Sequence, residues 1–226
     1  DGDGLDDLLI SGHLNDSGGS DAGAVYLIFA RSLGASSSVN LALADYKFTG
    51  TEGGSAGYSV ARAGDVDGDG LSDIVIGAYK NDEGGTDAGA AYIVLASSLG
   101  AETTVPLSES SYVLIGETAG DEAGGLVATA GDVDGDGLDD LLIGASYEAT
   151  AGDRAGAAYL ILGASLGTES VLSLSTADTK FTGENSGDRA GSLLSTPGDI
   201  DGDGLDDLLI GAWNSHAGAD DSGAIY

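Results

Sequence analysis

An acidic nonapeptide recurs at a fixed interval along this chain. DVDGDGLSD spans 65–73, DVDGDGLDD spans 132–140 and DIDGDGLDD spans 199–207, so consecutive copies start 67 residues apart. A shortened copy, DGDGLDD, spans 1–7. A fixed period of this length is typical of repeat architectures, in which each unit packs against its neighbours. The chain is therefore predicted to be an array of structurally similar units.

Each of the first three acidic segments precedes the same succession of four short apolar runs, and the segment 199–207 precedes the first two of them. The first follows directly, as in IVIG at 74–77, and the second contains Gly-Ala-x-Tyr, as in GAAYIVL at 89–95. Runs of this length bounded by Gly, Asp and Ser are typical of β-strands, and no helical period extends over a long window. Four strands cannot bury both faces of their sheet alone, whereas stacked neighbours can.

The predicted fold class is therefore all-β: a β-propeller of four-stranded blades of about 67 residues, in which the acidic segments are hairpin loops. The chain covers about three and a half such blades. The period divides it into a partial blade at 1–44, blades at 45–111 and 112–178, and a partial blade at 179–226.

The segment 56–95, AGYSVARAGDVDGDGLSDIVIGAYKNDEGGTDAGAAYIVL, resembles the FG-GAP repeat of integrin α-subunit propellers and their bacterial relatives. Similar segments cover essentially the whole chain. Phe and Pro of the name-giving motif are replaced, for example by Gly57-Tyr58 and Gly77-Ala78-Tyr79. Propellers of this family usually have seven blades, so the resemblance implies that this sequence belongs to a longer chain, or else that several copies close one ring.

The acidic segments have the ligand types and spacing of a calcium-binding loop. Aspartates stand at positions 1, 3, 5 and 9, a glycine at position 6 permits a sharp turn, and the leucine at position 7 can offer its backbone carbonyl. Calcium accepts about 6–8 oxygen ligands at flexible geometry, whereas magnesium demands a tighter octahedron. The predicted ligands in the complete loops are Asp65, Asp67, Asp69, Leu71 and Asp73; Asp132, Asp134, Asp136, Leu138 and Asp140; and Asp199, Asp201, Asp203, Leu205 and Asp207. The shortened loop retains Asp1, Asp3, Leu5 and Asp7 but lacks position 1, and we expect it to bind calcium weakly or only in an intact chain.

Other interpretations of these loops are less consistent with the sequence. An EF-hand would carry an acidic residue at position 12 followed by a helix, but position 12 is Ile76, Ile143 or Ile210. Solvated turns without a metal would leave four carboxylates repelling one another within nine residues. Because the ligands are local to one hairpin, we expect calcium to stabilise the fold rather than to regulate it.

The resemblance to the integrin family implies that ligands bind the face opposite the metal loops. One aligned position in the loop there holds His13, Tyr79, Ser146 and Trp213, in units that are otherwise nearly identical. Variation in a loop suggests a surface that can specialise, and His13, Tyr79 and Trp213 are candidates for binding a protein or a glycan. The alternative is that these aromatics only cover the blade edge. Arg154 and Arg189 are expected to be surface ion-pair partners.

Composition narrows the classes of function. Lys plus Arg number 7 against 38 Asp plus Glu, a net charge of −31, which argues against nucleic acid and anionic membranes as partners. No apolar run is long enough to insert into a membrane, and the absence of cysteine excludes disulfides. No catalytic motif is present, so we do not expect an enzyme.

The leading hypothesis is an extracellular or cell-surface, calcium-stabilised adhesion or recognition module. The alternatives are a self-associating surface or filament protein and the propeller domain of an enzyme that acts on polysaccharides or lipids.

Overall fold

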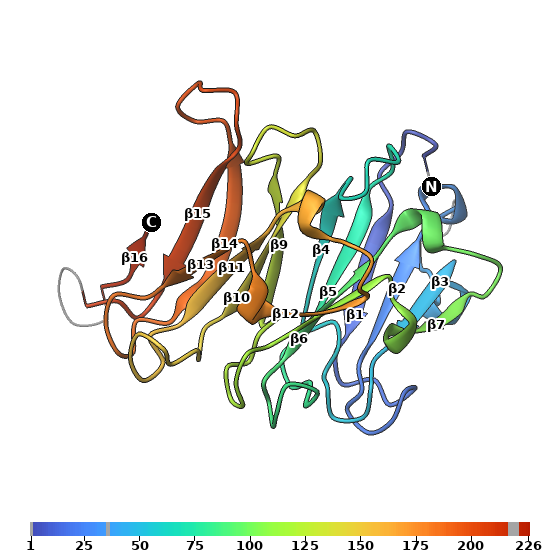
Figure 1. Ribbon diagram of the computed structural model, residues 1–226. Helices are drawn as coiled ribbons and strands as arrows, with labels where there is room; N and C mark the ends of the chain where they lie inside the picture. The colour runs from blue at the N-terminus through green and yellow to red at the C-terminus, as the bar shows by residue number, and fades with distance from the viewer. Residues whose placement is uncertain (1, 35–36, 217–221) are drawn as a thin grey trace.

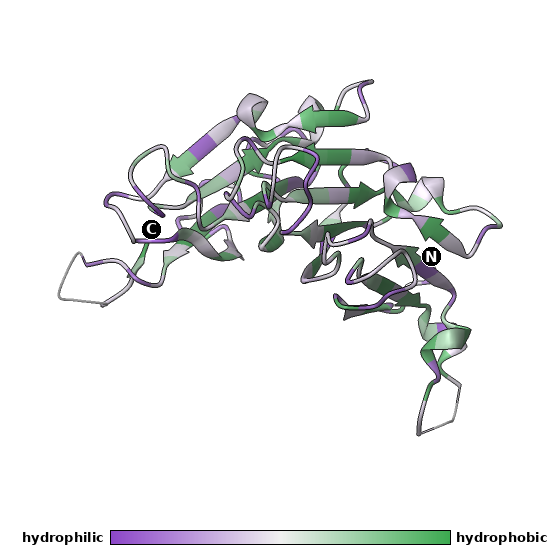
Figure 2. Cartoon of the chain, turned by 90° about the horizontal axis from the view of Figure 1, so that it is seen from below, coloured by the Kyte–Doolittle hydropathy of each residue, from purple (hydrophilic) through white to green (hydrophobic). Residues whose placement is uncertain are grey.

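The computed structural model describes residues 2–34, 37–216 and 222–226, and in these it is built from strands and short 3-10 helices. The strands form four sheets that stand side by side in chain order, from the blue N-terminal sheet to the red C-terminal one (Figure 1). Seen from one end of the strands, the sheets follow an open arc (Figure 2). The predicted all-β class is confirmed, and the sheets do not close into a ring.

The first sheet contains, in order, β1 (Leu8–Gly12), β2 (Ala24–Ile28), β3 (Tyr46–Thr49) and β7 (Thr104–Pro106). The second contains β4 (Ser59–Gly64), β5 (Asp73–Ala78), β6 (Ala90–Val94), β8 (Tyr112–Ile115) and β12 (Val171–Ser173). The third contains β9 (Leu126–Gly131), β10 (Asp140–Ala145), β11 (Ala157–Ile161) and β13 (Thr179–Thr182). The fourth contains β14 (Ala190–Gly198), β15 (Asp207–Ala212) and β16 (Ala224–Ile225). The 3-10 helices are η1 (Ala30–Ser32), η2 (Leu41–Leu43), η3 (Ala96–Ser98), η4 (Leu107–Glu109), η5 (Gly163–Ser165) and η6 (Leu174–Thr176).

The second and third sheets each contain a four-stranded antiparallel meander. In the second, β4 pairs with β5, β5 with β6 and β6 with β8, and the acidic loop joins the first two strands as predicted. The meander therefore starts at Ser59 and ends at Ile115, later than the unit 45–111 marked by the sequence period. The reason is that β3 pairs with β2 of the preceding sheet.

Two strands that the sequence pattern did not predict link neighbouring sheets. The connection from β6 to β8 contains β7, which pairs in parallel with β3 of the first sheet. The equivalent connection in the next unit contains β12, which pairs in parallel with β8 of the second sheet. Each connection thus adds a strand to the edge of the preceding sheet. At the other edge, β4 lies against β9 and β9 against β14.

The hydrophobic core lies between the sheets, because successive side chains of a strand point to opposite faces. In the second sheet, Ile76 and Tyr92 pack against the first sheet, whereas Val75 and Ile93 pack against the third. All four side chains are buried. Strands buried on both faces have continuous rather than alternating apolar sequences, which explains runs such as IVIG. Burial therefore positions every hairpin loop at the end of a rigid strand pair.

Candidate metal centre

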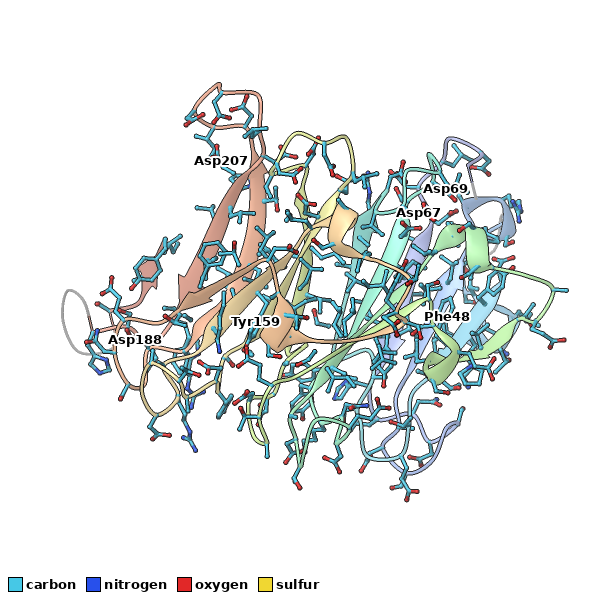
Figure 3. All side chains as sticks on the ribbon, in the orientation of Figure 1. Phe48, Asp67, Asp69, Tyr159, Asp188 and Asp207 are labelled. Carbon is cyan, nitrogen blue, oxygen red and sulfur yellow. The ribbon has the colours of Figure 1, made fainter. Side chains whose placement is uncertain are left out.

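The three complete acidic loops lie at the same end of the sheets. They join β4 to β5, β9 to β10 and β14 to β15, so each loop begins and ends on paired strands. Figure 3 shows Asp67, Asp69 and Asp207 at this end of the molecule and Asp188 at the other. The same local sequence in each unit therefore produces a row of equivalent loops.

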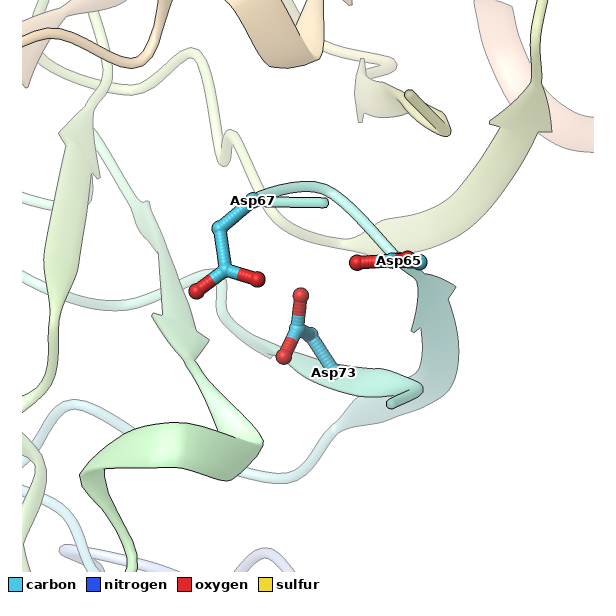
Figure 4. Close-up of side chains that lie close together, drawn as sticks. All are labelled: Asp65, Asp67 and Asp73. Carbon is cyan, nitrogen blue, oxygen red and sulfur yellow. The ribbon is translucent and has the colours of Figure 1, made fainter. Parts of the chain in front are cut away.

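Carboxylates converge within each complete loop. Three aspartates per loop place one oxygen each within 4.8 Å of the others. The groups are Asp65, Asp67 and Asp73 (Figure 4); Asp132, Asp134 and Asp136; and Asp199, Asp201 and Asp203. The groups thus contain positions 1 and 3 in all three loops, together with position 9 in the first and position 5 in the other two.

Backbone amides hold the carboxylates of each complete loop in place. Gly70 N–H donates to Asp65 Oδ2 at 2.9 Å, and Leu71 N–H donates to Asp69 Oδ1 at 2.7 Å. The same bonds recur in the other two loops, where Gly137 and Gly204 donate to the position-1 aspartates. These bonds use some carboxylate lone pairs and leave others for a cation.

The position-9 aspartates tie each loop to a neighbouring turn. Asp73 is 1% exposed, and its two oxygens accept from Val66 N–H at 3.0 Å and Ala96 N–H at 2.8 Å. Asp140 does the same with Val133 and Gly163, both at 2.9 Å. Burial raises the pKa of Asp73 and of Asp140 to about 6. These two carboxylates are therefore costly to ionise in the absence of a nearby positive charge.

The residues fit a hard divalent cation. The donor set consists of carboxylate oxygens, and Oδ1 of Asp65 is buried without a hydrogen-bond partner in the described part of the chain. A buried, unpaired carboxylate oxygen is unfavourable unless it has a cation or donor to interact with. These loops could therefore hold a metal ion such as calcium. In the shortened loop, Leu5 N–H donates to Asp3 Oδ1 and Ala30 N–H to Asp7 Oδ1, whereas Asp1 lies outside the described residues.

The aspartate at position 8 was missed by the sequence reasoning. Asp139 Oδ2 accepts from Asp65 N–H, at position 1 of the preceding loop, at 2.8 Å, and Asp206 Oδ2 accepts from Asp132 N–H at 3.1 Å. A Cβ on Gly64, which has φ +88°, would lie 2.2 Å from Asp139 Oδ2, so only glycine permits this approach. The consecutive aspartates in DGLDD were a possible signal, since only one of them was needed for the metal. Position 8 thus connects adjacent loops into a row.

The opposite end of the sheets carries the aromatic positions. Tyr79 follows β5 directly, about 20 Å along the strand from the acidic loop. The centroid of the Tyr58 ring lies 4.4 Å from that of Tyr79 and 5.5 Å from that of His13. The sequence pattern did not single out Tyr58 as a candidate. Trp213 is 57% exposed. His13 and Tyr79 therefore share an aromatic cluster, whereas Trp213 is in the fourth unit.

Arg154 and Arg189 do not form the ion pairs expected of them. No described carboxylate oxygen lies within 4.0 Å of either guanidinium. Both groups stack on the ring of Tyr147, at 5.2 Å and 4.6 Å from its centroid, and Arg189 also lies 5.2 Å from the ring centre of Trp213. Cation–π contact with an aromatic side chain replaces the predicted salt bridges.

Comparisons with known proteins agree with this geometry. A family model for the FG-GAP repeat matches residues 56–94, 123–161 and 191–226, which include the three complete acidic loops. The chain is 34% identical to integrin alpha-PS2 of Drosophila melanogaster over 165 residues, 70% of this chain and 11% of that protein. It is 33% identical to integrin alpha-4 of Xenopus laevis over 154 residues, 68% of this chain and 14% of that protein. It is 31% identical to human integrin alpha-IIb over 165 residues, 71% of this chain and 15% of that protein. The chain spans only a small part of the length of these relatives. Its sheets correspond to the β-propeller blades that FG-GAP repeats form. The chain therefore belongs to the FG-GAP repeat family.

Proposed function

We propose that this chain is an extracellular or cell-surface recognition module whose fold is stabilised by calcium and whose ligand binds the end opposite the metal loops. The observation that carries the proposal is the division between the two ends of the sheets. One end repeats the same acidic loop, whereas the other varies from unit to unit at His13, Tyr79, Ser146 and Trp213. Repeated chemistry suits a structural role, and varied chemistry suits recognition.

Calcium would be held by the aspartates at positions 1, 3, 5 and 9, together with the carbonyl of the leucine at position 7. When bound, it would neutralise carboxylates that otherwise repel one another in a chain with a net charge of −31. Because position 8 bonds to the preceding loop, the order that calcium imposes on one loop would extend to its neighbour. Such a role suits the calcium-rich extracellular environment.

The recognition role is supported by the exposed aromatic side chains at the opposite end. Trp213 and Tyr58 are 57% and 53% exposed, and aromatic rings of this kind often dominate binding energies at interfaces. The similar proteins are integrin alpha subunits, which gives the recognition hypothesis its family context. No helix in the described parts of the chain is long and apolar enough to cross a membrane. We propose a protein or glycan ligand and no enzymatic activity.

A binding assay tests the proposal. Beads coated with the calcium-loaded protein would be applied to a panel of immobilised extracellular proteins and defined glycans. For any ligand found, we expect Tyr79→Ala or Trp213→Ala to weaken binding at least tenfold. Leu43→Ala, at an exposed position in the connection from β2 to β3, should leave it unchanged. Binding that survives Tyr79→Ala, Trp213→Ala and His13→Ala together would contradict a ligand site at this end.

Self-association is a second candidate, favoured by one observation. Leu8 and Ile10 of β1 are 42% and 36% exposed, whereas the equivalent Ile74 and Ile76 of β5 are buried. Within the described residues, the second edge of β1 has no strand partner, whereas the equivalent β5 pairs on both edges, with β4 and β6. A second copy could cover this edge. Light scattering after size-exclusion chromatography tests self-association. A protein that is monomeric at high concentration would rule self-association out. If an assembly forms, Ile10→Lys should dissociate it.

A further inference from the structure

Two loops of each unit carry a residue with an unusual backbone conformation, directly before an Ala-Gly pair. These residues are Asp21 and Ser55, Asp87 and Glu122, and Arg154 and Arg189, with φ between 50° and 58°. A backbone bond joins the members of each pair: Ser55, Glu122 and Arg189 donate their N–H to Asp21, Asp87 and Arg154 at 3.0, 3.0 and 3.2 Å. The repeat therefore places two side chains side by side in every unit, at the end opposite the metal loops.

Both positions have become arginine only in the third pair. Aspartate is tolerated in the left-handed region, whereas arginine has no local advantage there. The backbone therefore does not explain the two arginines. Their guanidiniums lie over the ring of one tyrosine, Tyr147, and the position equivalent to Tyr147 in the preceding unit is Lys80.

The N–H groups of the two guanidiniums have no hydrogen-bond acceptor among the described residues, which is unusual in so acidic a chain. Among the described residues, Lys180 pairs with two carboxylates, but neither Arg154 nor Arg189 makes an ion pair or a side-chain hydrogen bond. Beyond ion-pair distance, the charges of Arg154, Arg189 and Lys80 all act on one carboxylate, that of Glu122. Three of the seven cationic side chains thus gather in one place.

A hollow of about 520 Å³ adjoins Arg189. It is lined by three tyrosines, by Glu122 and by three serines; the tyrosines are Tyr58, Tyr79 and Tyr147. A second hollow, on the side of Arg154, shares Tyr147 and Glu122. The hollow thus combines flat aromatic faces, hydroxyl groups and a guanidinium. A sugar ring has C–H faces that pack on aromatic rings and hydroxyls that bond to serines, and a guanidinium binds a carboxylate through two parallel hydrogen bonds.

We propose that Arg189 and Arg154, with the aromatic hollow between Tyr79 and Tyr147, bind the carboxylate and ring of an acidic sugar in an anionic glycan. This inference rests on the proposed function, because it assigns a ligand class to the recognition end. An acidic peptide side chain would engage the guanidiniums but would leave the three rings and the serine hydroxyls without a role. Glu122 opposes an anion here, and burial raises its pKa, which reduces that opposition.

Calorimetric titration tests the proposal. The probes are trigalacturonate and its neutral, carboxyl-reduced counterpart, at constant calcium and ionic strength. We expect the acidic sugar to bind at least tenfold more tightly than the neutral one. Arg154→Asp and Arg189→Glu introduce the residues that the preceding unit carries at these positions, so both variants should fold; each should weaken binding at least tenfold. Glu122→Gln should strengthen binding two- to threefold.

The control is Arg62→Glu, which makes the same change in charge at an exposed position on β4 and should alter binding by less than twofold. Equal binding of trigalacturonate to wild type and to the arginine variants would overturn the proposal, because calcium in the acidic loops would then hold the sugar. Equal or tighter binding of hexaglutamate would also overturn it, in favour of an acidic peptide. If the bead assay depends on Tyr79 or Trp213 while trigalacturonate fails to bind, the proposed function stands and this inference falls.

Discussion

At the residue scale, equivalent positions of the repeat have different electrostatic surroundings. Asn81 is buried and donates from Nδ2 to the Tyr92 hydroxyl at 2.9 Å. The same position in the next unit is Glu148, whose buried carboxylate pairs with Lys180 at 3.2 Å. Asp121 lies nearby and is 4% exposed. The third unit therefore buries ionisable groups where the second buries an amide.

Asp121 should make stability depend on pH. Burial, and secondarily the charge of Glu148, raise the pKa of Asp121 from 3.8 to about 6. The folded state therefore holds this proton more tightly than the unfolded state does, and the resulting stability, present below pH 4, is lost as pH rises through 6. Asp121→Asn keeps an acceptor for Thr118 N–H and should raise the free energy of unfolding at pH 8 by about 1 kcal/mol.

Urea unfolding of variant and wild type at pH 5 and pH 8, with calcium in excess, measures this effect. The gain should be smaller at pH 5 than at pH 8. Glu102→Gln, at an exposed site, should stay within about 0.5 kcal/mol of wild type at both values. If the Asp121→Asn variant were no more stable than wild type at pH 8, ionisation of the buried Asp121 carboxyl group would not cost stability.

The position-8 aspartate should couple adjacent loops. Asp139→Ala removes the acceptor for Asp65 N–H and should lower the free energy of unfolding by about 1–2 kcal/mol. It should also weaken calcium binding by the 65–73 loop. Asp6→Ala is the matched control, at the same repeat position but exposed. Thermal unfolding and calcium titration of both variants test this, and equal effects of the two substitutions would contradict the coupling.

At the element scale, the neighbouring sheet decides what an apolar strand contributes. Strands β1 and β10 both contain the sequence LLI, at the same position of the repeat. Leu141 of β10 is 0% exposed and packs in the core between the second and third sheets, whereas Leu8 of β1 is 42% exposed. Identical residues therefore have different energetic roles.

Truncation of these two leucines measures the difference. Leu141→Ala should lower the free energy of unfolding by about 2–4 kcal/mol, through lost burial and the cavity left behind. Leu8→Ala should cost less than about 1 kcal/mol, because its side chain is already partly in water. The midpoints of urea unfolding report both values. A comparable loss for the two variants would mean that β1 is covered in solution, as by self-association.

At the scale of the whole molecule, the charge distribution leads us to expect a fold that depends on cations. The net charge is −31, and the three complete loops concentrate aspartates at one end of the sheets. Coulomb repulsion among these groups opposes folding when no cation is bound. The loops are also linked through Asp139 and Asp206, so their stabilities are not independent.

Calcium removal should therefore lower the melting temperature substantially. A site that is saturated at a calcium concentration 100 times its Kd adds about 2.7 kcal/mol to the free energy of unfolding. Melting curves recorded in calcium, in magnesium and in excess chelator, at equal ionic strength, test this prediction. We expect calcium to exceed magnesium in its effect, and an unchanged melting temperature in chelator would refute a structural role for the metal.

Much of the architecture could be predicted because it depends on local sequence. The acidic loops lie between paired strands, as their glycines and aspartates indicated, and the apolar runs after them form β5, β10 and β15. Strands β7 and β12 could not be found this way, because they are short and pair with another unit. The same holds for Asp139, Tyr58 and Arg189, whose partners are distant in sequence.

The sequence by itself determined the repeat, the strand pattern and the acidic loops that we propose as metal sites, since turn geometry and side-chain alternation are local properties. Only the tertiary structure decided which leucines are buried, which aspartates link one loop to the next and which arginines lack a carboxylate partner. The physical reason is that burial and hydrogen bonding between units depend on how the sheets stack. Leu141 is buried because the second sheet packs against it, whereas no described sheet covers the equivalent Leu8.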